Sequence, residues 1–205
     1  MEEVRIANSV PELDVSIDRD DKGIVITIKK KAQGIKLGDV PCGKIVTIGK
    51  RKYIVVGHGE ETTALFGAEE FCRMEFGEDA DYRCSKPRKY LNGDFLKEVA
   101  DVVGMENIVK HKVKLEANNG TNKGVICYDH ISLITTGLYR RYREYIPASG
   151  RWFWTATKDS DVSVSCVCVV DSDGCMDWNV CANCSGIRPF LILNSSVLIL
   201  EDEQQ

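Results

Sequence analysis

The last third of the chain constrains the fold most, because helical periodicity ends there and short strand patterns replace it. Between Trp152 and Leu193, short apolar stretches alternate with polar turns such as Asp171–Gly174. Short apolar stretches bounded by turn residues are typical of strands. Tight polar turns join antiparallel neighbours. The stretches are 152–154, 162–170, 176–180 and 187–193. This pattern predicts an antiparallel sheet.

Helix signals occupy the middle of the chain. Ser85 followed by Pro87 is a helix start, and that helix is expected to end at 92–93. Asp94 is predicted to cap a second helix that stops at Gly104. A third helix is expected to be capped by Thr136 and to run through Tyr145. Together with the sheet, these helices predict an α+β fold from residue 35 onward.

The first half of the chain contains strand patterns on both sides of a predicted domain boundary between residues 34 and 35. Residues 1–34 are interpreted as an N-terminal strand or hairpin appendage, because isoleucines at 24, 26 and 28 alternate with Val25, Thr27 and Lys29. This segment is expected to pair with a neighbouring subunit, which would make an oligomer, or with the main sheet. Residues 35–205 are taken as the main domain. It is expected to open with a hairpin of strands 44–48 and 53–56, continue through 64–66, and form a short helix over 68–74.

Composition restricts the class of function. The chain has 205 residues, 43% of them hydrophobic, and a formal net charge of -4, which argues against a dedicated nucleic-acid binder. No apolar run approaches the length of about 18 residues that a membrane helix needs. The acidic start, 1–5, does not resemble a secretory signal. We therefore expect synthesis in a cytoplasm without membrane insertion, and display on a phage particle remains open.

Motifs for catalysis are weak. Gly38–Lys44 spells most of a phosphate-binding loop, but Ile45 stands where Ser or Thr should follow, and a strand rather than a helix is expected next. Cys127 and His130 are three residues apart on a predicted strand and so face opposite sides. No other nucleophile and base are paired by spacing. Binding without a cofactor is therefore favoured over catalysis.

Nine cysteines leave two interpretations open. Cys166 and Cys168 share a strand face, and Cys181 and Cys184 have the spacing of a zinc knuckle, so the four could hold zinc. Free cysteine also packs as a small apolar residue. Three valines of the same stretch share the alternation of Cys166 and Cys168, which favours packing. No metal site is predicted.

Two separated motifs together resemble a known group of proteins. The segment 84–96 follows the pattern S-x-x-R-x-x-L-N-x-x-F, and Trp152–Thr157 is followed about thirty residues later by Gly186–Phe190, which begins G-I-R-P. These motifs resemble bacterial and prophage domains related to the variable proteins of diversity-generating retroelements. Those proteins have a C-type lectin-like fold related to formylglycine-generating enzymes. The resemblance covers residues 35–193, and its departure is the high cysteine content.

The resemblance implies a ligand-binding, receptor-recognition module for a protein or glycan surface. Its scaffold would contain Trp152, Trp154, Gly186, Arg188 and Pro189. Both tryptophans are expected mainly in the core, and Arg188 is expected to be at least partly buried and hydrogen-bonded. The ligand-binding residues would be Thr157, Asp159, Ser163, Ser165, Asp177, Trp178, Asn179 and Asn183. The alternatives are a zinc-stapled interaction domain and an oxidase on a formylglycine-generating-enzyme-like scaffold.

Overall fold

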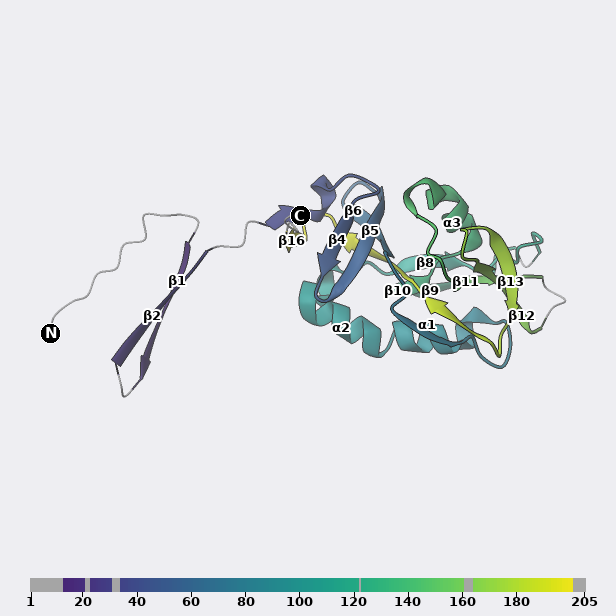
Figure 1. Cartoon of the computed structure of the whole chain (residues 1–205), viewed down its shortest axis with the longest axis horizontal. Coiled ribbons are helices and arrows are strands. Elements are labelled where there is room, and N and C mark those ends of the chain that lie inside the picture. The colour runs from purple at the N-terminus through teal and green to yellow at the C-terminus, as the bar shows by residue number, and fades with distance from the viewer. Residues whose placement is uncertain (1–12, 21–22, 31–33, 122, 161–163, 201–205) are drawn as a thin grey trace.

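The computed structural model describes residues 13–20, 23–30, 34–121, 123–160 and 164–200. It combines short helices with several sheets, which confirms the α+β prediction (Figure 1). Among the described residues, none of the helices has the length and apolar character that a membrane crossing requires.

The first large sheet is built from both ends of the main part of the chain. Its order is β10-β15-β6-β5-β4, and all its pairs are antiparallel. The expected hairpin is confirmed as β4 and β5, and β6 continues the meander. The strands are β4 (Ile45–Ile48), β5 (Arg51–His58), β6 (Thr62–Gly67), β10 (Ile131–Leu133) and β15 (Pro189–Asn194).

The second large sheet contains most of the last third of the chain. Its order is β13-β12-β11-β14-β7. The predicted antiparallel pattern is confirmed except between β11 and β14, which run parallel with Phe153 opposite Gly186. The strands are β7 (Cys72–Glu75), β11 (Phe153–Lys158), β12 (Cys166–Val170), β13 (Met176–Val180) and β14 (Cys184–Ile187).

Smaller elements complete the fold. Three two-stranded sheets are β1 (Leu13–Asp20) with β2 (Gly23–Lys30), β3 (Gly34–Lys36) with β16 (Leu198–Leu200), and β8 (His111–Lys114) with β9 (Ile126–Asp129). The α-helices are α1 (Lys86–Leu91), α2 (Asp94–Val103) and α3 (Thr136–Tyr142). Single 3₁₀ turns cover Leu37–Asp39, Tyr82–Cys84, Met105–Asn107 and Arg143–Tyr145. In Figure 1 the β1–β2 hairpin stands apart from the rest of the described chain.

The S-x-x-R-x-x-L-N segment ties α1 to the first sheet. Ser85 is the N-cap, since its Oγ accepts a hydrogen bond from the backbone N of Arg88 at 3.2 Å. The Arg88 guanidinium donates to the buried carboxylate of Asp129, with Nη2 to Oδ1 at 2.7 Å. The Asn92 side chain donates to the Ile131 carbonyl at 2.8 Å and accepts from the backbone N of His130 at 3.1 Å. The conspicuous polar residues of this motif therefore position a helix.

Three local predictions are wrong. Residues 68–74 do not form a helix, because β7 begins at Cys72 and pairs with β14, a partner that local propensity cannot reveal. Gly93 rather than Asp94 occupies the N-cap of α2, because only two residues separate α1 from α2 and Asp94 already lies in the first turn. Thr135 rather than Thr136 caps α3 and accepts from the backbone N of Leu138 at 3.2 Å.

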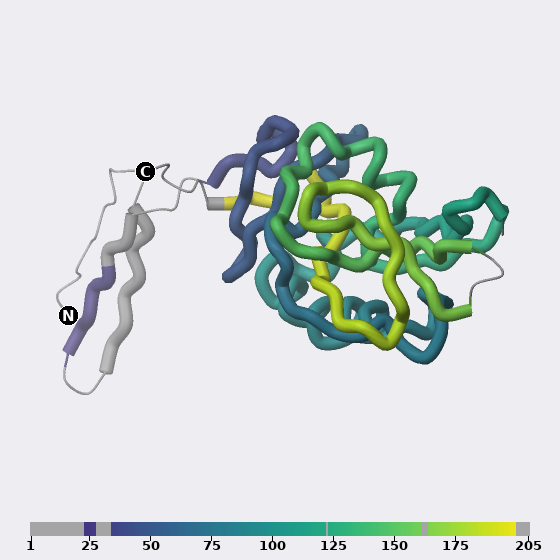
Figure 2. Tube along the Cα trace, turned by 45° about the vertical axis from the view of Figure 1, so that its right-hand side comes forward, coloured from purple at the N-terminus to yellow at the C-terminus, as the bar shows by residue number. Residues whose placement is uncertain are grey.

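Two apolar clusters lie on opposite faces of β11. Trp154 belongs to the larger cluster, which α1 and α2 help to cover, and Phe153 belongs to the smaller cluster beside α3. The trace in Figure 2 shows the C-terminal segment passing through the body rather than over its surface. That path follows from β14 and β15, which are interior strands of the two large sheets.

Candidate functional site

Arg188 holds the junction where the chain leaves β14 and enters β15. The guanidinium is buried, and it donates to the carbonyls of Gly67 at 2.9 Å and Ala68 at 3.1 Å. It also lies between the rings of Phe66 and Phe153, at 4.4 and 4.8 Å from their centroids. Burial lowers the pKa of Arg188 to about 10. The prediction of a buried, hydrogen-bonded Arg188 is confirmed, with carbonyls and rings as partners.

The two tryptophans of the W-x-W motif behave differently. Trp154 is fully buried, donates from Nε1 to the Met74 carbonyl at 2.9 Å, and packs edge-on against Phe76. Trp152 precedes β11 and its side chain is 37% exposed, so the expectation that it is mainly core is wrong. Its carbonyl still accepts a hydrogen bond from the backbone N of Gly186 at 2.9 Å. A Cβ added at Gly186 would collide with the side chain of Glu70. Trp152 therefore contributes its backbone to the scaffold.

Strand β13 forms one free edge of the second sheet and carries the exposed Trp178. Its only strand partner among the described residues is β12, with Trp178 opposite Cys168. The Trp178 side chain is 53% exposed, and Val180, two residues on and on the same face, is also exposed. Asp177 is exposed on the other face. An aromatic side chain on an edge strand is thus about half exposed to solvent.

Hydrogen bonds fix the two ends of β13. Asp171 Oδ1 accepts from the backbone N of Asp173 at 2.9 Å and of Cys175 at 2.8 Å, which holds the turn before the strand. After the strand, Asn183 Nδ2 donates to Asn179 Oδ1 at 2.7 Å, and Asn179 Nδ2 donates to Ser185 Oγ at 3.1 Å. We call the set Asp177, Trp178, Asn179, Val180 and Asn183 the β13 surface; Asn179 is half-buried and the other four are exposed.

The remaining predicted contacts are dispersed. Thr157 is buried, and its Oγ1 accepts from the backbone N of Thr136 at 3.0 Å, so it lies beneath α3 and not on the exposed surface as predicted. Asp159 and Ser165 flank the start of β12, where Ser165 is exposed. Ser163 lies outside the described residues. Asp177, Asn179 and Asn183 therefore lie on β13 or just after it, as Trp178 does, but Asp177 and Asn179 are on the strand face opposite Trp178, and Thr157 lies away from all of them.

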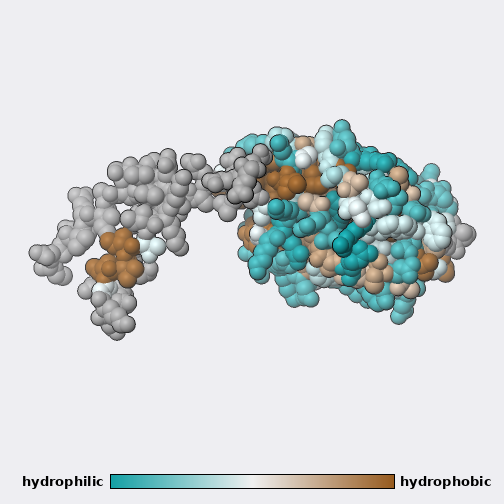
Figure 3. Space-filling view, in the orientation of Figure 1, coloured by the Kyte–Doolittle hydropathy of each residue, from teal (hydrophilic) through white to brown (hydrophobic). Residues whose placement is uncertain are grey.

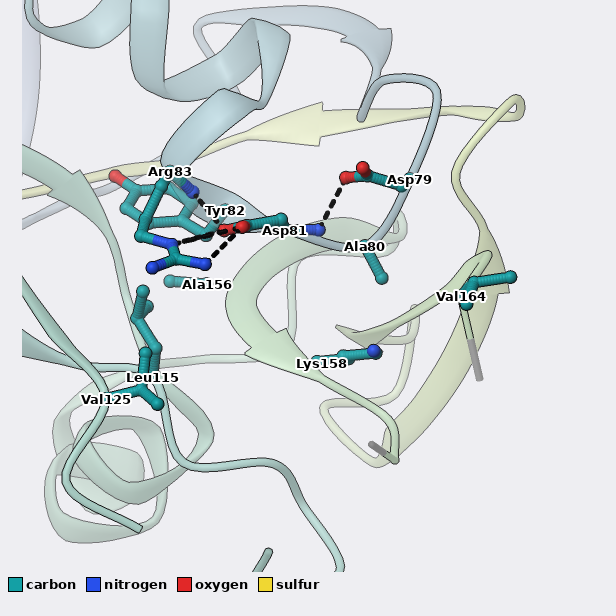
Figure 4. A pocket seen from close by; sticks show the side chains of 10 residues that line it. All are labelled: Asp79, Ala80, Asp81, Tyr82, Arg83, Leu115, Val125, Ala156, Lys158 and Val164. Carbon is teal, nitrogen blue, oxygen red and sulfur yellow. Dashed lines mark hydrogen bonds and ion pairs between the residues drawn. The ribbon is translucent and has the colours of Figure 1, made fainter. Parts of the chain in front are cut away.

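A charged pocket that the sequence patterns did not indicate lies near the start of β12 and the end of β13. Its volume is about 230 Å³, and Figure 4 shows the side chains around it. The backbone joins it to the β12–β13 end: Ala80 N donates to the Val164 carbonyl at 3.0 Å, and Cys181 N donates to the Ser165 carbonyl at 2.8 Å. The lining residues are Asp79, Ala80, Asp81, Tyr82, Arg83, Leu115, Val125, Ala156, Lys158 and Val164.

The pocket is lined by both apolar and charged side chains. Arg83 donates to Asp81 through Nε and Nη2, with Nη2 to Oδ2 at 2.6 Å, and this bonding holds the pKa of the Asp81 carboxyl below its usual value. Asp79 Oδ1 accepts from the backbone N of Asp81 at 2.8 Å. The described lining contains no histidine, cysteine or serine, so it offers binding groups but no such nucleophile. Five separated segments, 79–83, 115, 125, 156–158 and 164, supply its lining, so no single sequence motif could indicate it.

Comparison of the chain with protein-family models, curated proteins and solved structures finds no match.

The C-terminal thiols are held in different environments. Burial raises the pKa of Cys168 to about 12 and that of Cys181 to about 11, which favours the protonated thiols. Cys166 is half-buried and Cys184 is exposed. Within the part of the chain that the structure describes, no three His, Cys, Asp or Glu side chains gather as a metal site would require. Burial therefore gives Cys168 and Cys181 packing roles, whereas Cys184 lies in solvent.

Proposed function

We propose that this chain is a ligand-binding module that recognises a protein or glycan surface through the β13 surface. The observation that carries the proposal is Trp178, a large aromatic side chain that is 53% exposed on a strand with both ends fixed. Tryptophan is enriched among the residues that dominate binding energy, since it offers rigid contact area at low entropic cost. The polar neighbours Asp177 and Asn179 lie on the opposite face of β13, so they would add hydrogen-bonding groups for a ligand that reaches around this edge strand.

The sequence resemblance supports a more specific form of this proposal. The chain would be a C-type lectin-like receptor-binding protein of phage or prophage origin, related to diversity-generating retroelement variable proteins. In that arrangement, scaffold and contact residues are separate. The burial of Trp154 and Arg188 and the exposure of Asp177 and Trp178 agree with such a division.

A paired substitution tests the proposal. The protein would be applied to a glycan array and to isolated bacterial surface proteins, and affinity for a bound component would be measured. Trp178→Ala should weaken binding by at least about 30-fold, equivalent to about 2 kcal/mol. Its unfolding free energy should change by no more than about 0.5 kcal/mol, because the side chain is largely solvated. Trp152→Ala, which removes another exposed tryptophan outside the β13 surface, is the matched control.

Several results would contradict the proposal. An equal loss of binding in Trp178→Ala and Trp152→Ala would show that the β13 surface is not the binding site. A cysteine-dependent turnover with no binding to either class of surface would favour the oxidase alternative. The retroelement relationship has its own test in the nucleotide sequence, where a template repeat and a reverse transcriptase gene should lie near the coding region.

A further inference from the structure

Four cationic side chains line a cavity that shares no residue with the β13 surface or with the charged pocket. The cavity has a volume of about 600 Å³. Lys112 and Lys114 line it from β8, and Arg140 and Arg141 line it from α3. We call it the β8–α3 pocket. Most of the surface visible on the body in Figure 3 is hydrophilic, so these cations are distinguished by their placement around one cavity rather than by their exposure.

Strand alternation makes the β8 wall of this pocket cationic. Lys112 and Lys114 are exposed, whereas His111 and Val113 are buried on the other face of the strand. The ladder between β8 and β9 fixes which face each residue occupies. Both lysine side chains therefore lie on the same exposed face, toward the cavity that they line.

The α3 wall is anchored by the residue that precedes its two arginines. Tyr139 is buried, and its hydroxyl donates to the Gly174 carbonyl at 2.8 Å. Arg140 and Arg141, which follow it, are exposed. Arg140 Nη2 donates to Asn118 Oδ1 at 2.9 Å, and Asn118 also lines the pocket. This bond connects α3 to the segment that follows β8, so the two cationic walls are held beside each other.

The lining carries more positive than negative charge. It contains these four cations and one acidic residue, Glu116, although acidic residues outnumber lysine and arginine in the whole chain by 31 to 27. None of the ion pairs between described residues involves any of the four cations. A concave site lined mainly by charge of one sign attracts and concentrates ligands of the opposite sign. The pocket is therefore suited to an anion.

We propose that the β8–α3 pocket binds a small molecule with two neighbouring phosphoryl groups, such as an organic diphosphate. Arginine presents a planar set of donors that matches phosphate oxygens, and lysine adds a compact charge with three donors. One pair of cations on each wall can engage two phosphoryl groups at once. The volume of the pocket lies within the range of about 300–1,000 Å³ that is usual for small-molecule sites. This site is separate from the β13 surface and does not depend on the function proposed for it.

Isothermal titration calorimetry of the full chain with inorganic pyrophosphate tests the proposal. Pyrophosphate should bind at a single site at least about 10-fold more tightly than orthophosphate or citrate, because it offers two phosphoryl groups to two pairs of cations. Lys114→Gln and Arg141→Gln should each weaken pyrophosphate binding by at least about 10-fold, since each removes a charged hydrogen-bond donor. Lys89→Gln on α1 and Arg143→Gln just after α3 are the matched controls, because they remove the same charge from exposed residues that do not line the pocket. All four side chains are exposed, so the variants should stay folded, as circular dichroism would verify.

Four results would overturn the proposal. The first is the absence of saturable pyrophosphate binding at low salt. The second is equal affinity for citrate, because the pocket would then attract anions without selecting phosphoryl groups. The third is an equal loss of binding in Arg141→Gln and Arg143→Gln, because the charge would then act from the surface at large. The fourth is a single-stranded oligonucleotide that binds more tightly than pyrophosphate. Trp178→Ala should bind pyrophosphate as the wild type does, so this experiment and the test of the β13 surface can fail separately.

Discussion

Replacing Arg88 with leucine should lower the free energy of unfolding by about 3–5 kcal/mol, because it leaves the Asp129 carboxylate buried and unpaired. The Asp129 side chain is 2% exposed, against 29% for Arg88. Arg88 Nε lies 2.9 and 3.0 Å from the two carboxylate oxygens, and Nη2 lies 2.7 Å from Oδ1. Much of the loss is therefore the cost of an uncompensated buried charge.

A second substitution separates that cost from the packing of the helix. In the Arg88→Leu/Asp129→Leu double variant both charges are gone, so most of the lost stability should return. Arg83→Leu is the matched control, because its ion pair with Asp81 has a similar two-nitrogen geometry but Arg83 is 54% exposed. An exposed pair contributes about 0–1 kcal/mol, so the control should change stability little.

Urea unfolding followed by fluorescence measures these differences. With a slope of about 2 kcal/mol per molar urea, a loss of about 3 kcal/mol lowers the midpoint by about 1.5 M. The reasoning is refuted if Arg88→Leu and Arg83→Leu shift the midpoint equally. It is also refuted if the double variant is as unstable as Arg88→Leu alone, because the loss would then come from the helix rather than from the carboxylate.

Three further predictions concern buried groups. Arg188→Ala should cost about 2–5 kcal/mol through a cavity and two abandoned carbonyls, and an unchanged melting temperature would contradict its place in the core. Trp154→Ala should lower the free energy of unfolding by about 3–5 kcal/mol, whereas Trp152→Ala should lower it by less than about 1 kcal/mol. A larger fall in urea midpoint for Trp152→Ala would contradict the burial of Trp154 and the exposure of Trp152. Burial lowers the pKa of His111 below its ordinary value of 6.5, so the folded state binds this proton more weakly than the unfolded chain. Stability from His111 is therefore present above about pH 6.5 and lost as the pH falls, and the drop in urea midpoint between about pH 7.5 and about pH 5.5 should be smaller in His111→Gln.

Local signals in the sequence predicted the elements that are stabilised locally. Ser85 caps α1 because its own side chain reaches the backbone of the first turn, and Gly104 ends α2 because its φ of 83° is readily available to glycine. The β4–β5 hairpin and the turn before β13 likewise depend on neighbouring residues. Such features can be predicted because partner and signal lie within a few residues of each other.

Features that depend on distant partners could not be predicted from local patterns. β7 is a strand because β14 pairs with it, although the two are separated by about a hundred residues of chain. Thr157 is buried because α3 lies over it, which its own polar neighbourhood does not indicate. The resemblance implied that Trp178 contacts ligand, and this residue is 53% exposed, but a polar–aromatic–polar strand pattern fits a buried tryptophan equally well. The charged pocket was missed because its lining combines residues as distant in the chain as Asp81 and Lys158.

The interior positions of β14 and β15 have a consequence for the order of folding. β15 pairs with β6 and β14 with β7, so each large sheet joins segments from opposite ends of the main part of the chain. Such non-local pairing makes folding slow, because long loops must close before the contacts form. During synthesis, neither sheet can be completed until residues 184–194 have emerged. Until then β6 and β7 present unpaired edges that can join other chains, so chaperone protection during translation should matter more for this protein than its size alone would suggest.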